Sequence, residues 1–147
     1  MDSPFLKLEN QLCFPLYVAA KAVVSRYNYF LDEIDLTYTQ YIAMMVLWEH
    51  NSVSVKELGG YLYLDSGTLT PLLKRLERKG FIQRERSTED ERLVNIAITE
   101  AGEALKEKAA LVPFKMYDCI SLTTEDTQAL STVLTKLIQQ MGAGDKV

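Results

Sequence analysis

The chain is poor in the residues that metal centres and disulfide scaffolds require. Its 147 residues include one histidine and two cysteines, Cys13 and Cys119, which lack the close spacing of zinc-ligand pairs. The sequence also has neither a Gly-rich phosphate loop nor a Gly-x-Ser-x-Gly nucleophile elbow. We therefore expect no metal, no cofactor and no enzymatic activity.

Long hydrophobic runs are absent as well. No apolar stretch approaches the roughly 20 residues that a membrane-spanning helix needs. The amino terminus lacks the cationic start and the long apolar stretch of a signal peptide. These absences predict a cytoplasmic protein without a membrane partner. In that reducing compartment a stable structural disulfide is not expected, so each cysteine is either a packing residue or a redox group.

Charge is unevenly distributed along the chain. The net charge is −4, but residues 74–92 hold seven cations against five acids. A basic segment in an acidic chain permits a directed contact with nucleic acid, although a solvated surface of mixed charge would have the same composition. Hydrophobic residues make up 48% of the chain, which is enough for one domain, or for one domain plus oligomerisation helices.

Apolar residues at helical spacing predict the first helix. They recur every three or four residues from Leu8 to Tyr27. Because proline is tolerated in the first turn of a helix but breaks it further in, Pro15 indicates that the regular helix begins near Cys13. A last helix, starting at Thr123, has a long apolar stripe too. We interpret these two apolar faces as a dimer interface.

Capping patterns mark the starts of three further helices, because a Ser or Thr side chain can accept from a free backbone amide two or three residues on. Two of them are full capping boxes, Thr37-Tyr-Thr-Gln40 and Ser54-Val-Lys-Glu57. The predicted helices run from 37 through Trp48, from 54 to about 62, and from Thr99 to about Leu111, where Pro113 interrupts the last one.

The start of the helix that precedes Gly80 has two interpretations. Local rules favour Thr70 as the cap and Pro71 as the first helical residue. Periodicity favours a cap at Asp65 or Ser66, and we prefer this earlier start because Gly67 gives the turn before the proline some slack. The apolar stripe that supports it consists of Leu69, Leu72, Leu73 and Leu76.

Two short segments follow this helix. Residues 81–86 and 92–98 flank a polar turn, 87–91, and are predicted to form a two-stranded hairpin. A helix with hydroxyls and cations, followed by a basic-tipped hairpin, is the winged form of the helix-turn-helix. The fold class is therefore predicted to be mainly α with a small β-hairpin.

The chain divides into three predicted regions. Residues 1–36 are expected to form an N-terminal dimerisation and sensor helix, and residues 99–147 the C-terminal dimerisation helices. Between them, residues 37–98 would form the winged helix-turn-helix, with the recognition helix at about 65–79 and the wing at about 81–98. A homodimer would hold two recognition helices about 34 Å apart, one turn of a DNA duplex, on a palindromic site.

The recognition helix and the wing supply the candidate DNA contacts. Hydroxyls and amides at the helix start reach bases or phosphates, and a basic wing tip fits the narrow minor groove. The simpler interpretation of the hydroxyls is helix capping. The predicted contacts are Ser66, Gly67, Thr68, Thr70, Lys74, Arg75, Arg86, Asp90 and Arg92, with Asp90 holding Arg92 or Arg86 by a charge-assisted bond.

Cys13 is a candidate redox group. At a helix start, unpaired amides and the helix dipole favour the thiolate, which reacts with peroxides; a buried packing cysteine is the alternative. Tyr17 shares its face of the helix. Tyr27 faces the same way but lies about 21 Å along the helix, so only a partner subunit's Tyr27 can meet Cys13 in an antiparallel arrangement. Tyr38 is expected to join it as a second hydrogen-bond donor.

The same residues resemble a known family. Leu64-Asp-Ser-Gly-Thr-Leu-Thr-Pro-Leu-Leu73 and Asp90-Glu-Arg92 resemble the MarR family of winged-helix repressors. Within that family, the closer match is to the OhrR organic-hydroperoxide sensors, over about residues 7–110. It rests on Leu8-Glu-Asn-Gln-Leu-Cys-Phe14, Tyr17, Tyr27, Leu36-Thr-Tyr-Thr-Gln-Tyr41 and Leu47-Trp-Glu-His50.

The resemblance implies a homodimeric repressor that binds a palindromic operator in double-stranded DNA. An organic hydroperoxide, as inducer, would oxidise Cys13, to which the partner subunit's Tyr27 and Tyr38 donate hydrogen bonds, and the operator would be released. The resemblance also implies the DNA contacts named above. A repressor controlled by a small phenolic or other apolar ligand, with an inert Cys13, is the alternative.

The chain departs from the one-cysteine members of this branch at two residues. Pro15 stands where an aliphatic residue is more usual, and Cys119 is a second cysteine. Members with a second cysteine near the last helices use it to form a disulfide with the partner's sensor. Cys119 is therefore either a resolving cysteine or an incidental thiol.

Overall fold

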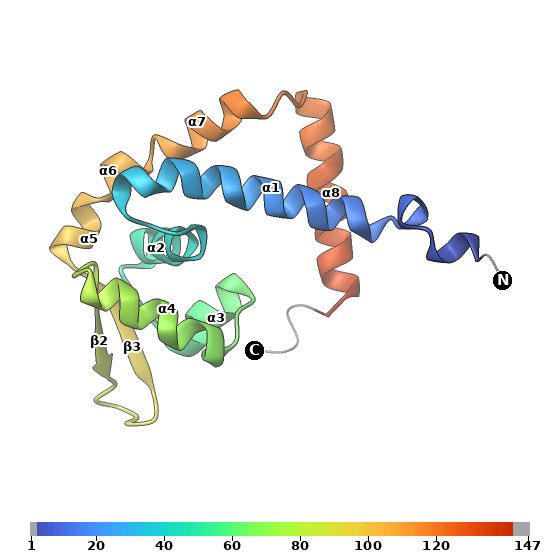
Figure 1. Ribbon diagram of the computed structural model, residues 1–147. Coiled ribbons are helices and arrows are strands. Elements are labelled where there is room, and N and C mark those ends of the chain that lie inside the picture. Colours follow the sequence, from blue (N-terminus) through green and yellow to red (C-terminus); the bar gives the residue numbers. More distant parts are fainter. Residues whose placement is uncertain (1–2, 143–147) are drawn as a thin grey trace.

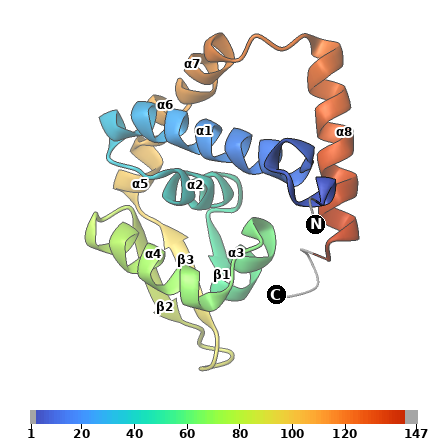
Figure 2. The ribbon, with the colours of Figure 1, turned by 45° about the vertical axis from the view of Figure 1, so that its right-hand side comes forward.

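Helices dominate the computed structural model, which describes residues 3–142 (Figures 1 and 2). A small antiparallel sheet, which includes the hairpin, packs against α2, α3 and α4. The helices are α1 (Cys13–Leu31), α2 (Tyr38–His50), α3 (Val55–Leu62), α4 (Ser66–Arg78), α5 (Glu100–Ala104), α6 (Lys106–Ala109), α7 (Val112–Cys119) and α8 (Thr124–Gln140). The strands are β1 (Ser52–Ser54), β2 (Ile82–Arg86) and β3 (Val94–Ile98).

Helix α1 begins at Cys13, as the position of Pro15 predicts. The proline lies in the first turn, where its missing N–H removes no helical hydrogen bond. The preceding residue, Leu12, provides no side-chain cap. The amino-terminal end of this helix therefore presents backbone amides that no capping side chain satisfies.

Both predicted capping boxes form. At the start of α2, Gln40 N donates to Thr37 Oγ1 over 3.4 Å and Thr37 N donates to Gln40 Oε1 over 3.1 Å. At the start of α3, Ser54 N donates to Glu57 Oε2 over 2.7 Å. These reciprocal bonds satisfy free amides at each helix start and confirm the predicted boundaries.

Helix α4 has the earlier of the two starts considered from the sequence. Asp65 is the cap, and its Oδ1 accepts a hydrogen bond from Thr68 N at 2.8 Å. Pro71 lies inside the helix. Thr70, the alternative cap, is a helical residue whose hydroxyl donates to the carbonyl of Ser66 at 2.8 Å. The buried leucine stripe thus outweighs the local proline rule.

The predicted hairpin forms as β2 and β3, and a third strand extends it into a sheet. It has three strands in the order β1-β3-β2, all antiparallel. The unpredicted strand, β1, has only three residues, too few to show alternation of polar and apolar side chains. Its Val53 pairs with Ile96 of β3, and both are buried. The sheet thereby ties the wing to the end of α2.

The segment after Thr99 is also more broken than predicted. Thr99 caps a helix as expected, with Gly102 N donating to its hydroxyl at 3.1 Å. However, the helical segment is divided into α5 and α6, and Pro113 lies in the first turn of α7. Proline there starts a new helix instead of ending the structured region, because its fixed backbone angle suits a first turn.

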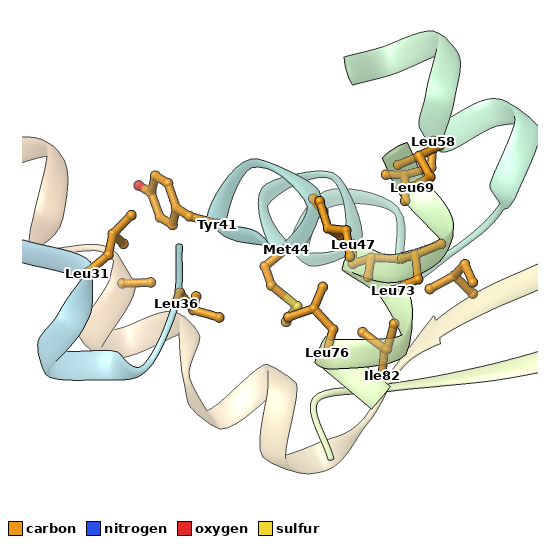
Figure 3. Packing of buried hydrophobic residues seen from close by; sticks show 14 of the residues in the cluster. Leu31, Leu36, Tyr41, Met44, Leu47, Leu58, Leu69, Leu73, Leu76 and Ile82 are labelled. Atoms are coloured by element: carbon orange, nitrogen blue, oxygen red, sulfur yellow. The ribbon is translucent and has the colours of Figure 1, made fainter. Parts of the chain in front are cut away.

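One hydrophobic core extends from the end of α1 to the wing (Figure 3). Leu31, Leu36 and Tyr41 form its α1–α2 end, and Met44 and Leu47 connect them to the leucines of α4 (Figure 3). These side chains are at most 4% exposed, apart from Leu72 of α4 at 6%. The core therefore crosses the predicted boundaries at residues 36 and 98, and includes Ala109 and Val112 near α7.

Helix α8 stands apart from α2–α4 in both views (Figures 1 and 2). None of its residues is buried, although it carries apolar side chains such as Leu130, Val133 and Ile138, which are 48%, 60% and 41% exposed. Gly142, with a positive φ of 62°, follows its end. No helix within residues 3–142 is both long and apolar enough to cross a membrane.

We expect Gly102→Ala to destabilise the fold by about 1–3 kcal/mol, the usual cost of overpacking a core. An added Cβ would overlap the backbone oxygen of Phe81 and lie 2.9 Å from Ile98 Cγ1. The measurement is the urea unfolding midpoint. Gly60→Ala is the matched control. A Cβ added at this residue would have no neighbouring atom within 4 Å, and the alanine should stabilise α3 by about 0.5–1 kcal/mol. Equal midpoints for the two variants would contradict this packing.

Candidate functional site

Helix α4 has one buried and one exposed face. Its four stripe leucines are at most 6% exposed and pack into the core. The predicted DNA-contact residues of this helix all lie in the remaining, solvent-exposed part of its surface. They are Ser66, Gly67, Thr68, Thr70, Lys74 and Arg75. The structure therefore groups two cations with the hydroxyls and free amides of the helix start, an arrangement that suits a polyanion.

The wing loop, residues 87–93, is held by its own hydrogen bonds. Ser87 Oγ accepts from the amides of Glu89 and Asp90 at 3.2 and 3.3 Å. Asp90 Oδ1 accepts from the amide of Arg92 at 3.0 Å and lies 3.8 Å from its Nε. Of the two predicted partners of Asp90, the structure selects Arg92 over Arg86. The Arg92 side chain is 93% exposed at the tip, and Arg86 is exposed at the end of β2.

An ion pair connects α4 to the wing. Glu77 Oε2 accepts from Arg84 Nε at 2.9 Å and lies 2.7 Å from its Nη2, and Glu77 Oε1 accepts from the Arg84 amide at 3.3 Å. Hydrogen bonds from the Arg84 side chain hold the pKa of Glu77 below its ordinary value. The carboxylate therefore stays ionised at neutral pH, and the bond between helix and strand is lost only as the pH falls through that lowered pKa.

A cavity of about 630 Å³ lies between α3, α4 and the wing. Its walls include Val55, Leu69 and Leu73, and the cations Arg84 and Arg92 border it. It is separate from the start of α1, where Cys13 lies. Within residues 3–142 no group of three His, Cys, Asp or Glu side chains could hold a metal ion.

Cys13 is the first residue of α1 and is exposed. This excludes the buried packing role within the chain that was its alternative interpretation. Tyr17, one turn further along, is 59% exposed, and the Lys21 ammonium lies 5.2 Å from its ring centroid. The sulfur and this phenol are thus available to a molecule docked on α1.

Tyr27 and Tyr38 form one aromatic cluster. Their ring centroids are 4.9 Å apart, and Tyr41 lies 6.0 Å from Tyr27. Burial, together with the neighbouring phenol of Tyr38, raises the pKa of Tyr27 above its ordinary value. Burial also raises the pKa of Tyr41, with smaller contributions from Tyr27 and Tyr38. Tyr27 and Tyr41 therefore stay protonated at physiological pH and remain hydrogen-bond donors.

The chain does not bring its own Cys13 to this cluster. Both Cys13 and Tyr27 lie on α1, and the rise of 1.5 Å per residue separates them by about 21 Å. Cys119 is exposed at the last position of α7 and is a free thiol, like Cys13. The predicted sensor residues thus form two separate groups on one chain.

The sequence does not single out the residues that hold α4 and the wing in place. It predicts Ser87 only as part of a polar turn, and Glu77 and Arg84 only as charges in a basic segment. Their opposite charges at the end of a helix and in the following strand were a usable signal. The hydroxyl of Ser87 gave none, because its two acceptor bonds depend on the fold of the loop.

The chain is similar over most of its length to known regulators. The family described as "Transcriptional regulator SarA/Rot" matches residues 25–109. The "Organic hydroperoxide resistance transcriptional regulator" of Bacillus subtilis (strain 168) is 47% identical over 143 residues, which are 96% of this chain and 97% of that protein.

Solved structures agree with this similarity. AbfR, a protein of Staphylococcus epidermidis, is 32% identical in its reduced form bound to DNA, with a TM-score of 0.81 over 96% of both chains. AbfR in a disulfide-formed state is 35% identical, with a TM-score of 0.64 over 89% of this chain and 92% of that one.

A mutant of MarR from E. coli, complexed with operator DNA, shares the fold. Its TM-score is 0.82 over 93% of this chain and 99% of that chain, at 24% identity. The predicted fold class and the prediction of a regulator rather than an enzyme are thereby confirmed. The chain, which also matches the SarA/Rot family, belongs to the OhrR-like branch of the MarR-type winged-helix transcriptional regulators.

Proposed function

We propose that this regulator is a cytoplasmic, homodimeric repressor that senses organic hydroperoxides through Cys13 and releases a palindromic operator when that sulfur is oxidised. The observation that carries the proposal is the exposed thiol at the uncapped start of α1. A cluster of phenols, Tyr27 and Tyr38, lies near the other end of the same helix. The similarity to an organic hydroperoxide resistance regulator supports it.

The dimer would be formed by the helices outside the winged-helix region. Apolar side chains on α1, α7 and α8 are exposed, among them Val18 at 46%, Phe114 at 71% and Val133 at 60%. Exposed apolar surface of this extent is typical of protein interfaces. An antiparallel pairing of two α1 helices would bring Cys13 of one subunit to the partner subunit's Tyr27 and Tyr38.

The sensing step is a two-electron oxidation. The Cys13 thiolate attacks one oxygen of the hydroperoxide, the O–O bond breaks, and the alkoxide leaves and takes up a proton to become an alcohol. The sulfur is oxidised to a sulfenic acid. Phenol donors from the partner subunit would stabilise the thiolate before the reaction, without adding a second full charge.

The sulfenic acid can then react with a thiol to form a disulfide and release one water. A small cellular thiol or Cys119 of the partner subunit would serve as that thiol, or a backbone nitrogen would give a sulfenamide. A mixed disulfide would add covalent bulk between the subunits, whereas a bridge to Cys119 or a sulfenamide would add a covalent constraint there. A shift between the two reading heads would then remove phosphate contacts, and each lost contact weakens binding strongly at physiological salt.

Oxidation of Cys13 should decide whether the protein stays on its DNA. Duplexes selected from a random pool by the reduced protein should be released after treatment with cumene hydroperoxide, whereas Cys13→Ser should stay bound because it has no oxidisable sulfur at that position. A band-shift titration of both proteins, reduced and oxidised, measures this. Release of DNA by oxidised Cys13→Ser would refute the sensor assignment.

Cys119→Ser is the matched control for the second thiol. If Cys119 resolves the sulfenic acid, this variant should lose an intersubunit disulfide that the oxidised wild type shows on a non-reducing gel. If Cys119 is incidental, the variant should release DNA as the wild type does and show the same gel pattern. The two outcomes decide between the roles left open by the sequence.

The second candidate function is a repressor controlled by a small apolar ligand, with Cys13 inert. The apolar cavity between α3, α4 and the wing favours it. This cavity adjoins α4, so a ligand bound there would lie next to the helix that is proposed to contact DNA. Thiol titration at neutral pH separates the two functions, since a Cys13 that does not react with a thiol reagent or with cumene hydroperoxide supports the ligand-controlled repressor.

A further prediction concerns the cations of α4. The substitutions Lys74→Met and Arg75→Met should each weaken binding to the selected duplex. Each should also make the slope of log affinity against log salt shallower by about 0.9 for the lost phosphate contact. Lys108→Met removes the same charge from an exposed site on α6 and should leave the slope unchanged. Equal slopes for all of these proteins would exclude Lys74 and Arg75 as phosphate contacts.

A further inference from the structure

Lys79, which directly follows α4, bonds to a distant part of the chain. Its ammonium donates to the backbone carbonyl of Asp35, to Asp35 Oδ1 at 3.0 Å and to Gln40 Oε1 at 3.3 Å. The acceptors belong to residues 32–41, which connect α1 to α2 and include the first turn of α2. We call this segment the α1–α2 corner. A single cation thus joins the end of the DNA-reading helix to that corner.

Lys79 makes these hydrogen bonds with a side chain that is largely shielded from solvent. Its side chain is only 25% exposed, and Gln40 is 3% exposed. The same Gln40 oxygen also accepts from Thr37 N, in the capping box of α2. Asp35 has a left-handed backbone with φ of 54°, which turns its carbonyl toward the ammonium. Lys79 therefore contacts the atoms that define where α2 begins.

The α1–α2 corner also holds the phenol cluster. Tyr38 lies between Thr37 and Gln40, and its amide donates to Asn28 Oδ1 of α1 at 2.7 Å. Its ring packs on Tyr27 at 4.9 Å. A displacement of these phenols would move the first turn of α2, and the Lys79 ammonium would have to follow it or release its acceptors.

We propose that Lys79 is the positioning residue that couples the α1–α2 corner to the DNA-reading helix α4. The coupling itself needs only these contacts. Its use as the route by which oxidation of Cys13 reaches the DNA rests on the proposed function. Because coupling between two sites is reciprocal, a corner whose intact state favours DNA binding through Lys79 must in turn be stabilised by DNA bound to α4.

A second lysine provides a matched control. Lys115 of α7 pairs with Glu33 of the same corner, Nζ to Oε2 at 2.8 Å, and its ammonium lies 5.8 Å from the ring centroid of Phe30. It is partly exposed, like Lys79, but does not lie next to α4. Lys115→Met removes a lysine bond from the corner without touching the reading helix.

The test is hydrogen exchange of the backbone amides of residues 32–41, in the full-length reduced protein, free and bound to the selected duplex. In the wild type and in Lys115→Met, DNA should slow exchange by about fivefold or more. In Lys79→Met, DNA should leave the exchange of the corner unchanged. Asp35→Asn keeps a residue that tolerates the left-handed backbone and should reduce the slowing as well, so a folding defect of one variant does not decide the result.

Three results would overturn the proposal. The first is equal slowing by DNA in Lys79→Met and in the wild type, and the second is no slowing in the wild type. The third is a salt slope of Lys79→Met that is shallower than the wild-type slope by about 0.9, because this would identify the lysine as a phosphate contact. An unchanged slope is expected, since the ammonium is occupied by the corner.

The oxidised proteins test the connection to sensing. The ratio of the dissociation constants after and before cumene hydroperoxide should fall at least about fivefold in Lys79→Met relative to the wild type and to Lys115→Met. If the wild type shows no change on oxidation, the proposed function fails, whereas the exchange measurement still decides the role of Lys79.

Discussion

Burial of the leucine stripe of α4 determines which residues this regulator presents to its surroundings. Each fully buried leucine contributes about 1.5–3 kcal/mol, and Leu69, Leu72, Leu73 and Leu76 are at most 6% exposed. Rotating the helix by half a turn would forfeit most of that free energy. The hydroxyls and cations of the opposite face are therefore held outward by the core, not by contacts among themselves. The pair Glu77–Arg84 then fixes the wing relative to this face.

The same core ties the reading surface to the opposite end of the molecule. Leu31, Leu36 and Tyr41 continue from the α4 leucines to the α1–α2 corner (Figure 3). The phenols of Tyr27 and Tyr38 lie on this continuous body, while Cys13 lies beyond it at the exposed start of α1. In the proposed mechanism the phenols of one subunit are therefore held by its packed core, and the sulfur that they contact comes from the partner subunit.

Most helix starts could be predicted from the sequence because they are decided locally. The leucine period narrows the cap of α4 to Asp65 or Ser66, of which Asp65 is the cap, and two capping boxes predict the starts of α2 and α3. β1 (Ser52–Ser54) could not be predicted because three residues show no period, and the interruption at Pro113 does not by itself reveal that the proline also starts α7. The contact of Lys79 with Asp35 joins residues far apart in the sequence, and no local pattern of charge indicates it. Individual site residues were therefore predictable, but the contacts between elements were not.

In the proposed sensor the sulfur of one subunit meets the phenols of the other, and mixed dimers isolate this contact. One chain carries Cys13→Ser, and the other carries both Tyr27→Phe and Tyr38→Phe. A site shared between subunits predicts that the remaining Cys13 of this mixed dimer is oxidised by cumene hydroperoxide as fast as in the wild type, as followed by mass spectrometry. An oxidation rate as slow as that of the homodimer with both phenylalanines would contradict the account.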